Sequence, residues 1–287
     1  MIATQLFTGL VLGMILVLLA LGLSLIFGLM TVVNFAHGAF YMLGAYIGFF
    51  ILGLTGNFWL GLLIVPLVIG TLGLMVERTL IKPLYGGDLN DPLLLTFGLT
   101  SVLIEIVKLI WGRWGFPFNP PRALEGLLDL GFTFFPTYYL FVIVMSAAVV
   151  LTLWLFLEKT DVGLIIRAGT RDSLMVRVLG LDFSRVQYLV FAIGTGLAGL
   201  AGILAAPIRG VNPDMGQSIL IDSFVVIVVG GMGSLLGAVV SGILIGEVVS
   251  LAGLYYPEMS NIVMFLFMAL VLLVRPAGLL GERGLLE

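Results

Sequence analysis

The single histidine of this chain, His37, stands in a short polar stretch inside an apolar region. An imidazole can titrate near neutral pH, while the neighbouring Asn34 and Gly38 supply a hydrogen-bonding amide and a permissive backbone. No acidic residue stands near His37 in the sequence. We therefore expect His37 to fix a break between helices by hydrogen bonding, with a proton relay as the alternative. An intramembrane serine protease would pair a serine with this histidine, for example Ser234, but the sequence offers that pair no further support.

Two stretches interrupt long apolar runs with polar or glycine residues, at 34–38 and at 230–234. Irregular backbone at membrane depth is tolerated only where it is buried in protein or lines a water-filled cavity. Both stretches are therefore candidates for a transport path, and a short surface turn between helices is the alternative. The candidate path residues are Asn34, Phe35, His37, Gly38, Gly230, Gly231, Gly233 and Ser234.

Three charged residues within apolar runs are further candidates. Glu105 and Lys108 stand three residues apart, on one face of a helix, where they can form an ion pair. Lys108 could instead extend to the membrane interface. Glu247 is an intramembrane carboxylate, which is a functional candidate by default, unless it lies near a membrane surface.

Several kinds of chemistry are excluded by composition. The chain has no cysteine, which excludes disulfides, zinc–cysteine sites and iron–sulfur clusters. One histidine cannot provide bis-histidine haem ligation. No strongly basic patch suggests nucleic acid, and the net charge of −3 says little about partners.

The elements that must position these residues are membrane helices. Apolar residues make up 61% of the chain and charged residues 10%, whereas soluble domains average about 45–50% and about 25%. The first charged residue is Glu77. The first apolar run is long enough to span, so we expect a retained helix rather than a cleaved signal peptide. Continuous rather than alternating apolar runs disfavour a β-barrel.

These runs predict an all-α, polytopic transmembrane helical bundle with about eight spans, including broken or re-entrant helices, in one domain over residues 1–287. The run around 230–234 is too long for one span and short for two. The expected spans are 6–30, 38–55, 58–77, 93–112, 137–157, 187–207, 219–250 and 261–275.

The segment 158–186 is the most basic connection, and basic loops face the cytoplasm. The loop at Arg78 and Lys82 and the tail at Arg275 agree with that side, so the loop 113–136 faces outside. The side of residue 1 depends on the break at Asn34 and stays open.

Part of the segment 158–186 predicts a short amphipathic helix. Thr170 or Asp172 can cap its start, Gly180 can end it, and Ser184 to Gln187 have the form of a capping box for the next span. Such a helix either lies on the membrane surface or docks a cytoplasmic partner. Its apolar arc consists of Leu174, Met175, Val178 and Leu179, with Ser173 and Arg177 opposite.

Small residues recur every fourth position in two of the expected helices. This spacing lets helix backbones approach closely, because lipid supplies little hydrophobic drive for association. Packing within the chain is the expected use, and packing against a second membrane subunit is the alternative. The residues are Gly194, Ala198 and Gly202, then Gly233, Gly237 and Ser241, and then Ala238, Gly242 and Gly246.

Four runs together resemble the membrane permease subunits of ATP-binding-cassette importers for branched-chain amino acids, and the resemblance covers nearly the whole chain. The runs are VVNFAHGAFYMLGAY (32–46), RAGTRD with LGLD (167–172 and 179–182), FAIG with LAGLAG (191–194 and 197–202), and VGGMGSLLGA (229–238).

The resemblance implies that residues about 165–182 form a coupling loop against an ATPase subunit. Val176 and Arg177 depart from the small residues more usual in that loop. The coupling residues it implies are Arg167, Arg171, Asp172, Met175, Leu179 and Gly180.

The resemblance also implies the partners: a second permease (identical or homologous), two cytoplasmic ATP-binding subunits, and a periplasmic or extracellular substrate-binding protein. The chain contains no phosphate-binding loop of the form GxxxxGK[ST], so ATP and Mg would be bound by those partners and this chain would not be an enzyme. The expected location is the bacterial cytoplasmic membrane. The expected cargo is branched-chain or other small amino acids. Urea or short amides, an ion-coupled secondary transporter, and a structural subunit are the alternatives.

Overall fold

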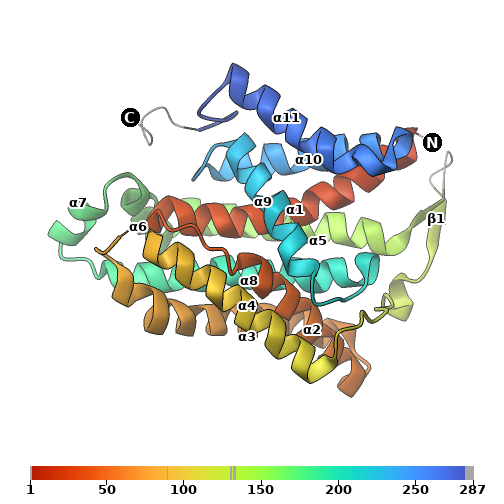
Figure 1. Cartoon of the computed structure of the whole chain (residues 1–287), viewed down its shortest axis with the longest axis horizontal. Helices are drawn as coiled ribbons and strands as arrows, with labels where there is room; N and C mark the ends of the chain where they lie inside the picture. Colours follow the sequence, from red (N-terminus) through yellow and green to blue (C-terminus); the bar gives the residue numbers. More distant parts are fainter. Residues whose placement is uncertain (1, 89, 130, 132–133, 282–287) are drawn as a thin grey trace.

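The computed structural model describes residues 2–88, 90–129, 131 and 134–281, most of which are helical. Figure 1 shows long helices running side by side, with the short helices α6 and α7 at one end of the bundle and the strand β1 at the other. The α-helices are α1 (Ile2–Met30), α2 (His37–Thr55), α3 (Phe58–Val76), α4 (Asn90–Trp111), α5 (Thr137–Lys159), α6 (Asp161–Arg171), α7 (Ser173–Val178), α8 (Phe183–Arg209), α9 (Met215–Gly230), α10 (Leu235–Tyr255) and α11 (Ser260–Val274).

Shorter elements connect or extend these helices. The strands β1 (Leu127–Asp129) and β2 (Phe134–Pro136) pair antiparallel in the connection between α4 and α5. Single turns of other helix types are η1 (Glu77–Ile81), η2 (Lys82–Leu84), η3 (Arg122–Leu124) and η4 (Pro257–Met259).

Eight helices of the described chain are long and apolar enough to cross a membrane, which confirms the predicted polytopic helical bundle. They are α1, α2, α3 with its extension to Leu84, α4, α5, α8, α10, and α11 with its preceding turn. The ninth apolar helix, α9, has 16 residues and would extend about 24 Å, short of the roughly 30 Å hydrocarbon core.

The predicted span 219–250, in which broken or re-entrant helices were expected, holds most of α9 and most of α10. The chain turns between them at Gly231 and Gly233, whose φ angles of 103° and 82° strongly favour glycine. Ser234 then caps α10 by accepting a hydrogen bond from the Gly237 amide at 3.0 Å. The apolar run is therefore a helical hairpin.

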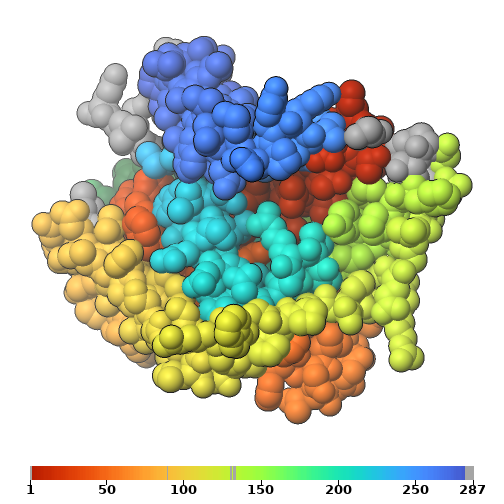
Figure 2. Space-filling model, turned by 45° about the vertical axis from the view of Figure 1, so that its right-hand side comes forward, coloured from red at the N-terminus to blue at the C-terminus, as the bar shows by residue number. Residues whose placement is uncertain are grey.

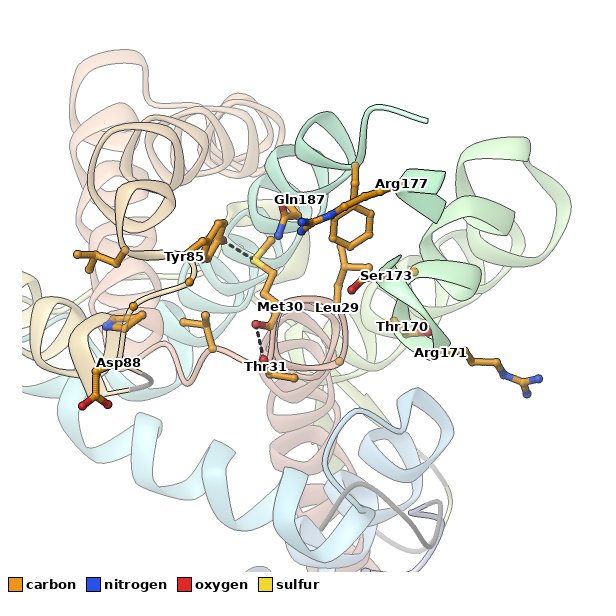
Figure 3. Close-up of a pocket in the computed structure, with 18 residues that line it drawn as sticks. Leu29, Met30, Thr31, Tyr85, Asp88, Thr170, Arg171, Ser173, Arg177 and Gln187 are labelled. Atoms are coloured by element: carbon orange, nitrogen blue, oxygen red, sulfur yellow. Dashed lines mark hydrogen bonds between the residues drawn. The ribbon is translucent and has the colours of Figure 1, made fainter. Parts of the chain in front are cut away.

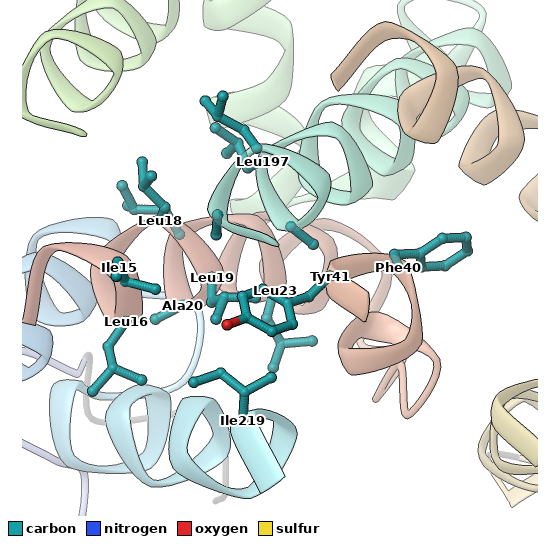
Figure 4. Packing of buried hydrophobic residues seen from close by; sticks show 14 of the residues in the cluster. Ile15, Leu16, Leu18, Leu19, Ala20, Leu23, Phe40, Tyr41, Leu197 and Ile219 are labelled. Carbon is teal, nitrogen blue, oxygen red and sulfur yellow. The ribbon is translucent and has the colours of Figure 1, made fainter. Parts of the chain in front are cut away.

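The helices α1 and α8 form the centre of the bundle. Each is buried along most of its most apolar part, and α1 packs against α5, α8, α9 and α10. Figure 4 shows α1 residues such as Leu19 and Leu23 packed beside Tyr41 of α2 and Ile219 of α9. Helices on the outside expose apolar side chains, as Leu109 does with 84% of its surface, which suits contact with lipid.

Glycines allow the central helices to touch. A Cβ added at Gly194 would strike Gly22 of α1, one at Gly202 would strike Tyr41 of α2, and one at Gly242 would strike Val17. Gly237 lies against Gly230 across the α9–α10 turn, and Ala198 is fully buried. The small residues singled out in the sequence thus lie at helix contacts within this chain.

The two ends of the bundle differ in charge. Basic residues gather at the end where α1 finishes, near α6 and α7, and the positive-inside rule makes this end cytoplasmic. At the other end, the start of α1 meets the end of α10, where the Gln5 side chain donates to the Ser250 carbonyl at 2.7 Å. The first described residues therefore lie outside, which the sequence left open.

Candidate functional site

The first break, Thr31 to Ala36, leads the chain from the cytoplasmic end of α1 back into the bundle without a helix. Its backbone needs other partners, and threonines of α4 supply them. The Phe35 amide donates to Thr96 Oγ1, and the Thr100 hydroxyl donates to the Phe35 carbonyl, both at 3.1 Å. Within the break, Asn34 Oδ1 accepts from the Ala36 amide at 3.1 Å. Irregular backbone is thus held inside protein.

His37 begins α2 in the interior, with no solvent exposure. Its Nε2 lies 3.1 Å from the carbonyl oxygen of Leu19, near the middle of α1. His37 thus makes the hydrogen-bond contact that the sequence led us to expect beside the break. Gly38 follows directly against Gly216 of α9. The N-terminus of α2, where backbone amides lack helical partners, therefore lies at mid-depth in the bundle.

The second break lies at the cytoplasmic end rather than beside the first. Gly233 lies against Gly28, near the end of α1. The segment after α11 closes over the turn, since the amides of Leu279 and Leu280 donate to the carbonyls of Val229 and Gly230 at 2.8 and 3.0 Å. This stretch thus forms a covered turn, which favours a turn between helices over a transport path. Its residues are Gly230, Gly231, Gly233 and Ser234.

Three aromatic rings meet at the first break. The Phe35 ring lies 5.4 Å from that of Phe224 on α9 and 6.5 Å from that of Phe97 on α4, measured between centroids. None of the three is fully buried. Figure 2 shows a hollow on one face of the molecule, with α9 at its centre, α10 and α11 above it and α4 below it. The Phe35 ring thus links α4 to α9.

The cytoplasmic segment 158–186 holds two helices, α6 and α7, where the sequence predicted one. Asp172, one of the two candidate caps, does cap α7: its carboxylate accepts a hydrogen bond from the Met175 amide at 2.9 Å. Thr170 instead donates to the Arg167 carbonyl. Gly180, with φ of 77°, ends the turn after α7. The apolar arc of α7 is exposed, with 54–73% of each residue accessible; it comprises Leu174, Met175, Val178 and Leu179.

The predicted capping box at Ser184 was wrong, because α8 begins at Phe183, two residues before the start that a Ser184 cap would give. Asp182 caps the helix instead, accepting from the Arg185 amide at 3.4 Å. Phe183 is buried against Gly169 of α6, with the Arg177 guanidinium 5.2 Å from its ring centroid. Tertiary packing of this aromatic ring therefore sets the helix start.

A cavity of about 300 Å³ opens on the cytoplasmic side between the end of α1, the segment at Tyr85 to Asp88, and the helices α6 and α7. Figure 3 shows Gln187, Arg177 and Tyr85 around it, while Arg171 extends away from it. Tyr85 donates to Glu77 Oε1 at 2.9 Å. Burial and the neighbouring Glu77 carboxylate raise the pKa of the Tyr85 hydroxyl, which stays protonated as a donor.

The cavity was not visible in the sequence, because its walls come from segments far apart in the chain. Of the predicted coupling residues, Arg171 is one of those that line the cavity, although its side chain extends away from it. Arg167 instead forms an ion pair with Glu158. Tyr85 and Asp88 are lining residues that no sequence pattern singled out, and Gln187 was noted only as part of a capping box.

The charged candidates fall into two groups. Lys108 Nζ lies 3.0 Å from Glu105 Oε1, which confirms the predicted ion pair, and 4.0 Å from Asp214 in the segment before α9. Glu247 lies instead between α10 and α1, directly against Gly9. That position is a helix contact rather than the hollow on α9.

Asp222 and Arg209 are residues that the sequence reasoning passed over. Asp222 is the one charged residue between positions 215 and 246, which is the signal that could have identified it. It lies half-buried in α9, and Arg209 lies exposed at the end of α8.

Comparison with known proteins places these features in a family. The model of the permease component of branched-chain amino acid transport systems matches residues 5–272. The high-affinity branched-chain amino acid permease protein BraD of Pseudomonas aeruginosa is 31% identical, with 97% of this chain and 95% of BraD covered. LivH of Escherichia coli is 30% identical with the same coverage. LivM of Escherichia coli is 28% identical, with 94% of this chain and 68% of LivM covered.

A solved structure shares the fold. The structure of PsaBC from Streptococcus pneumoniae in complex with a Fab matches with a TM-score of 0.51, covering 93% of this chain and 89% of that chain. The sequence identity is 15%, so the match concerns the arrangement of helices alone.

Proposed function

This chain belongs to the family of permease components of branched-chain amino acid transport systems, and we propose that it is the membrane-translocating subunit of an ATP-driven importer for such amino acids. The observation that carries this proposal is the family match over residues 5–272, together with relatives near 30% identity that align over nearly their full length. It is a multi-pass protein of the cytoplasmic membrane.

The proposed energy source lies in partner subunits, since the sequence has no GxxxxGK[ST] loop. Two ATPase subunits would bind ATP and Mg, and the exposed apolar arc of α7 is the surface we assign to them. Exposed apolar patches on a soluble-facing element mark interaction sites. Movement of α7 would pass to the membrane helices through α6 and α8, because Phe183 at the start of α8 packs on Gly169 of α6.

The proposed path uses the first break. Hydrogen bonds of Asn34 and His37 hold irregular backbone at mid-depth. The Phe35 ring would connect this break with the hollow, because it packs against Phe224 of α9. A second permease subunit would close the hollow from the other side. Two related permeases, LivH and LivM, occur among the relatives, which supports a pair of different chains; a pair of copies is the alternative. A soluble binding protein would deliver cargo to the outer end.

The test is uptake by the purified importer reconstituted in liposomes with its permease, ATPase and binding-protein partners. We expect ATP-dependent accumulation of radiolabelled leucine, with no accumulation of urea or acetamide. Uptake that persists without ATP or without the ATPase subunits would contradict the proposal and favour an ion-coupled carrier. Omitting only the binding protein should reduce leucine uptake strongly, which serves as the control for directed delivery.

A further inference from the structure

A groove of about 340 Å³ lies between α3 and α8, which run side by side (Figure 1). The groove exists because both helices carry glycine there. A Cβ added at Gly70 would approach the Ala192 carbonyl, and one added at Gly196 would approach the Pro66 carbonyl. Leu67 lines the groove and exposes 64% of its surface, so the groove opens toward the membrane rather than into the bundle.

The lining of this groove is almost entirely apolar. Thr71 contributes its one hydroxyl, which already donates to the Val68 carbonyl at 2.8 Å. A groove of this kind suits an apolar chain, because a charged or polar solute would lose its hydration and gain no partner. The groove is therefore separate from the proposed path of an amino acid.

Basic side chains lie at the cytoplasmic end of the same two helices. The Lys82 ammonium, in the extension of α3, donates to the hydroxyl of Tyr188 on α8 and lies 4.8 Å from the centroid of that ring. Tyr188 stands four residues before Ala192, which lines the groove. Arg78 stands four residues after Leu74, which lines it from α3. Residues four apart share a helix face, about 6 Å along the axis, so the groove continues toward both cations.

These two cations have no carboxylate to neutralise them. Neither Arg78 nor Lys82 forms an ion pair within 4 Å in the part of the chain that the structure describes. The Glu77 carboxylate is buried and accepts a hydrogen bond from a tyrosine. Asp182, at the start of α8, is paired with Arg185 at 2.8 Å. Positive charge therefore remains available to an anion at the cytoplasmic surface of the membrane.

An anionic phospholipid of the cytoplasmic leaflet has both complementary features. Its phosphate can accept charge-assisted hydrogen bonds from Arg78 and Lys82. Its acyl chain extends through a leaflet of about 15 Å, half of the hydrocarbon core, which is far enough to enter the groove. Basic pockets between membrane helices on the cytoplasmic side bind anionic headgroups. A helix of a second permease could fill the groove, but it would leave the two cations without a partner.

We propose that α3 and α8 bind an anionic phospholipid, with its phosphate on Arg78 and Lys82 and one acyl chain in the groove between Gly70 and Gly196. The bound lipid packs over both helices near Tyr188, close to the start of α8. The site does not depend on which cargo the protein carries, so it stands apart from the proposed function.

Lipid binding to the importer assembled with its partner subunits, measured by native mass spectrometry, tests the proposal. The complex is titrated with phosphatidylglycerol and, separately, with phosphatidylcholine that carries the same oleoyl chains. The wild-type complex should bind phosphatidylglycerol more tightly. Lys82→Gln and Arg78→Gln should each weaken phosphatidylglycerol binding roughly fivefold and leave phosphatidylcholine binding unchanged. Thr71→Phe places a ring in the groove and should weaken binding of both lipids.

Matched controls are available on α5. Lys159→Gln removes an exposed lysine at the end of that helix, and Thr152→Phe places the same ring on an exposed position of it. Both variants should bind the two lipids as the wild type does. Lys82→Arg keeps the charge and should retain the preference for phosphatidylglycerol. Unchanged melting temperatures show that the variants are folded.

Three results would overturn the inference. The first is equal affinity of the wild-type complex for the two lipids, or unchanged phosphatidylglycerol binding in both Lys82→Gln and Arg78→Gln. The second is displacement of phosphatidylglycerol by glycerol phosphate, which has no acyl chain, because that would make the cations a site for soluble anions. The third is loss of the second permease from Thr71→Phe, which would make the groove a subunit interface.

Discussion

At the scale of single residues, the structure depends on positions where nothing larger than hydrogen fits. Gly38 begins the contact of α2 with α9, because a Cβ there would strike the Gly216 backbone. The same helix contains Gly53, whose added Cβ would meet nothing within 4 Å. The two glycines therefore provide a direct comparison between a packed and an open site.

We expect Gly38→Ala to destabilise the protein by about 1–3 kcal/mol, the usual cost of forcing extra atoms into a packed site. Leucine uptake should fall as well, because α9 must move away from α2. Gly53→Ala should be neutral or stabilising by up to about 1 kcal/mol, since alanine favours helix over glycine. Melting temperatures of the purified variants in detergent measure the difference. Equal melting temperatures would refute the close contact between α2 and α9.

Residue types in the sequence predicted some of these features and not others. His37 was identifiable because a lone imidazole in an apolar run must find a hydrogen-bond partner. That partner, the Leu19 carbonyl, could not be identified, since any carbonyl of a neighbouring helix would serve equally. Asp222 was detectable as an isolated charge in the apolar run that forms α9.

At the scale of elements, the exposed arc of α7 is the feature that most needs a partner. Leu174 and Leu179 expose 71% and 70% of their surfaces on the cytoplasmic side. The short helix is fixed at its start by Asp172 and at its end by Gly180. An element held this firmly presents its apolar side chains in one arrangement, which suits a constant docking surface.

We expect Leu179→Asp to weaken retention of the ATPase subunits roughly tenfold or more, since burying a leucine at an interface contributes about 1.5–3 kcal/mol. Leu127→Asp is the matched control, because Leu127 exposes 68% of its surface in β1 on the opposite side of the membrane. Co-purification of the ATPase at increasing salt and detergent measures retention. Full retention in Leu179→Asp would refute docking at α7.

Helix boundaries agreed with the prediction from sequence where the thickness of the membrane determines helix length. They differed from it where packing within the protein determines where a helix begins or ends. Long apolar runs gave eight spans because a membrane helix needs about 20 apolar residues. The glycines at 231 and 233 indicated a break, but only packing decides whether a break becomes a tilt, a turn or a pair of helices. The start of α8 moved from the predicted cap at Ser184 to Asp182 because Phe183 is held against α6.

At the scale of the whole molecule, the arrangement of helices predicts a definite sidedness. The strands β1 and β2 lie at one end of the bundle and the helices α6 and α7 at the other. Since basic residues concentrate at the second end, it faces the cytoplasm. The chain contains no cysteine, so single cysteines can report this arrangement without background.

We expect Leu127→Cys to react with a membrane-impermeant maleimide in intact cells, because β1 lies outside. Leu179→Cys should react only after the cells are permeabilised. The unmodified chain, which has no thiol, provides the blank. Labelling of position 179 in intact cells, with position 127 protected, would show that the proposed orientation is reversed.

The most apolar helix is also one of the most enclosed. The best 18-residue window of α1 has a mean hydropathy of 2.9, yet 83% of it is buried inside the protein and little of it meets lipid. During synthesis, however, α1 emerges long before α8 and α10 exist to surround it. The high hydropathy of α1 is therefore needed during membrane insertion, when this helix must partition into the bilayer without its later neighbours. Polar substitutions in α1 should therefore impair membrane insertion, even where the folded bundle could satisfy the hydrogen bonds of the new side chain.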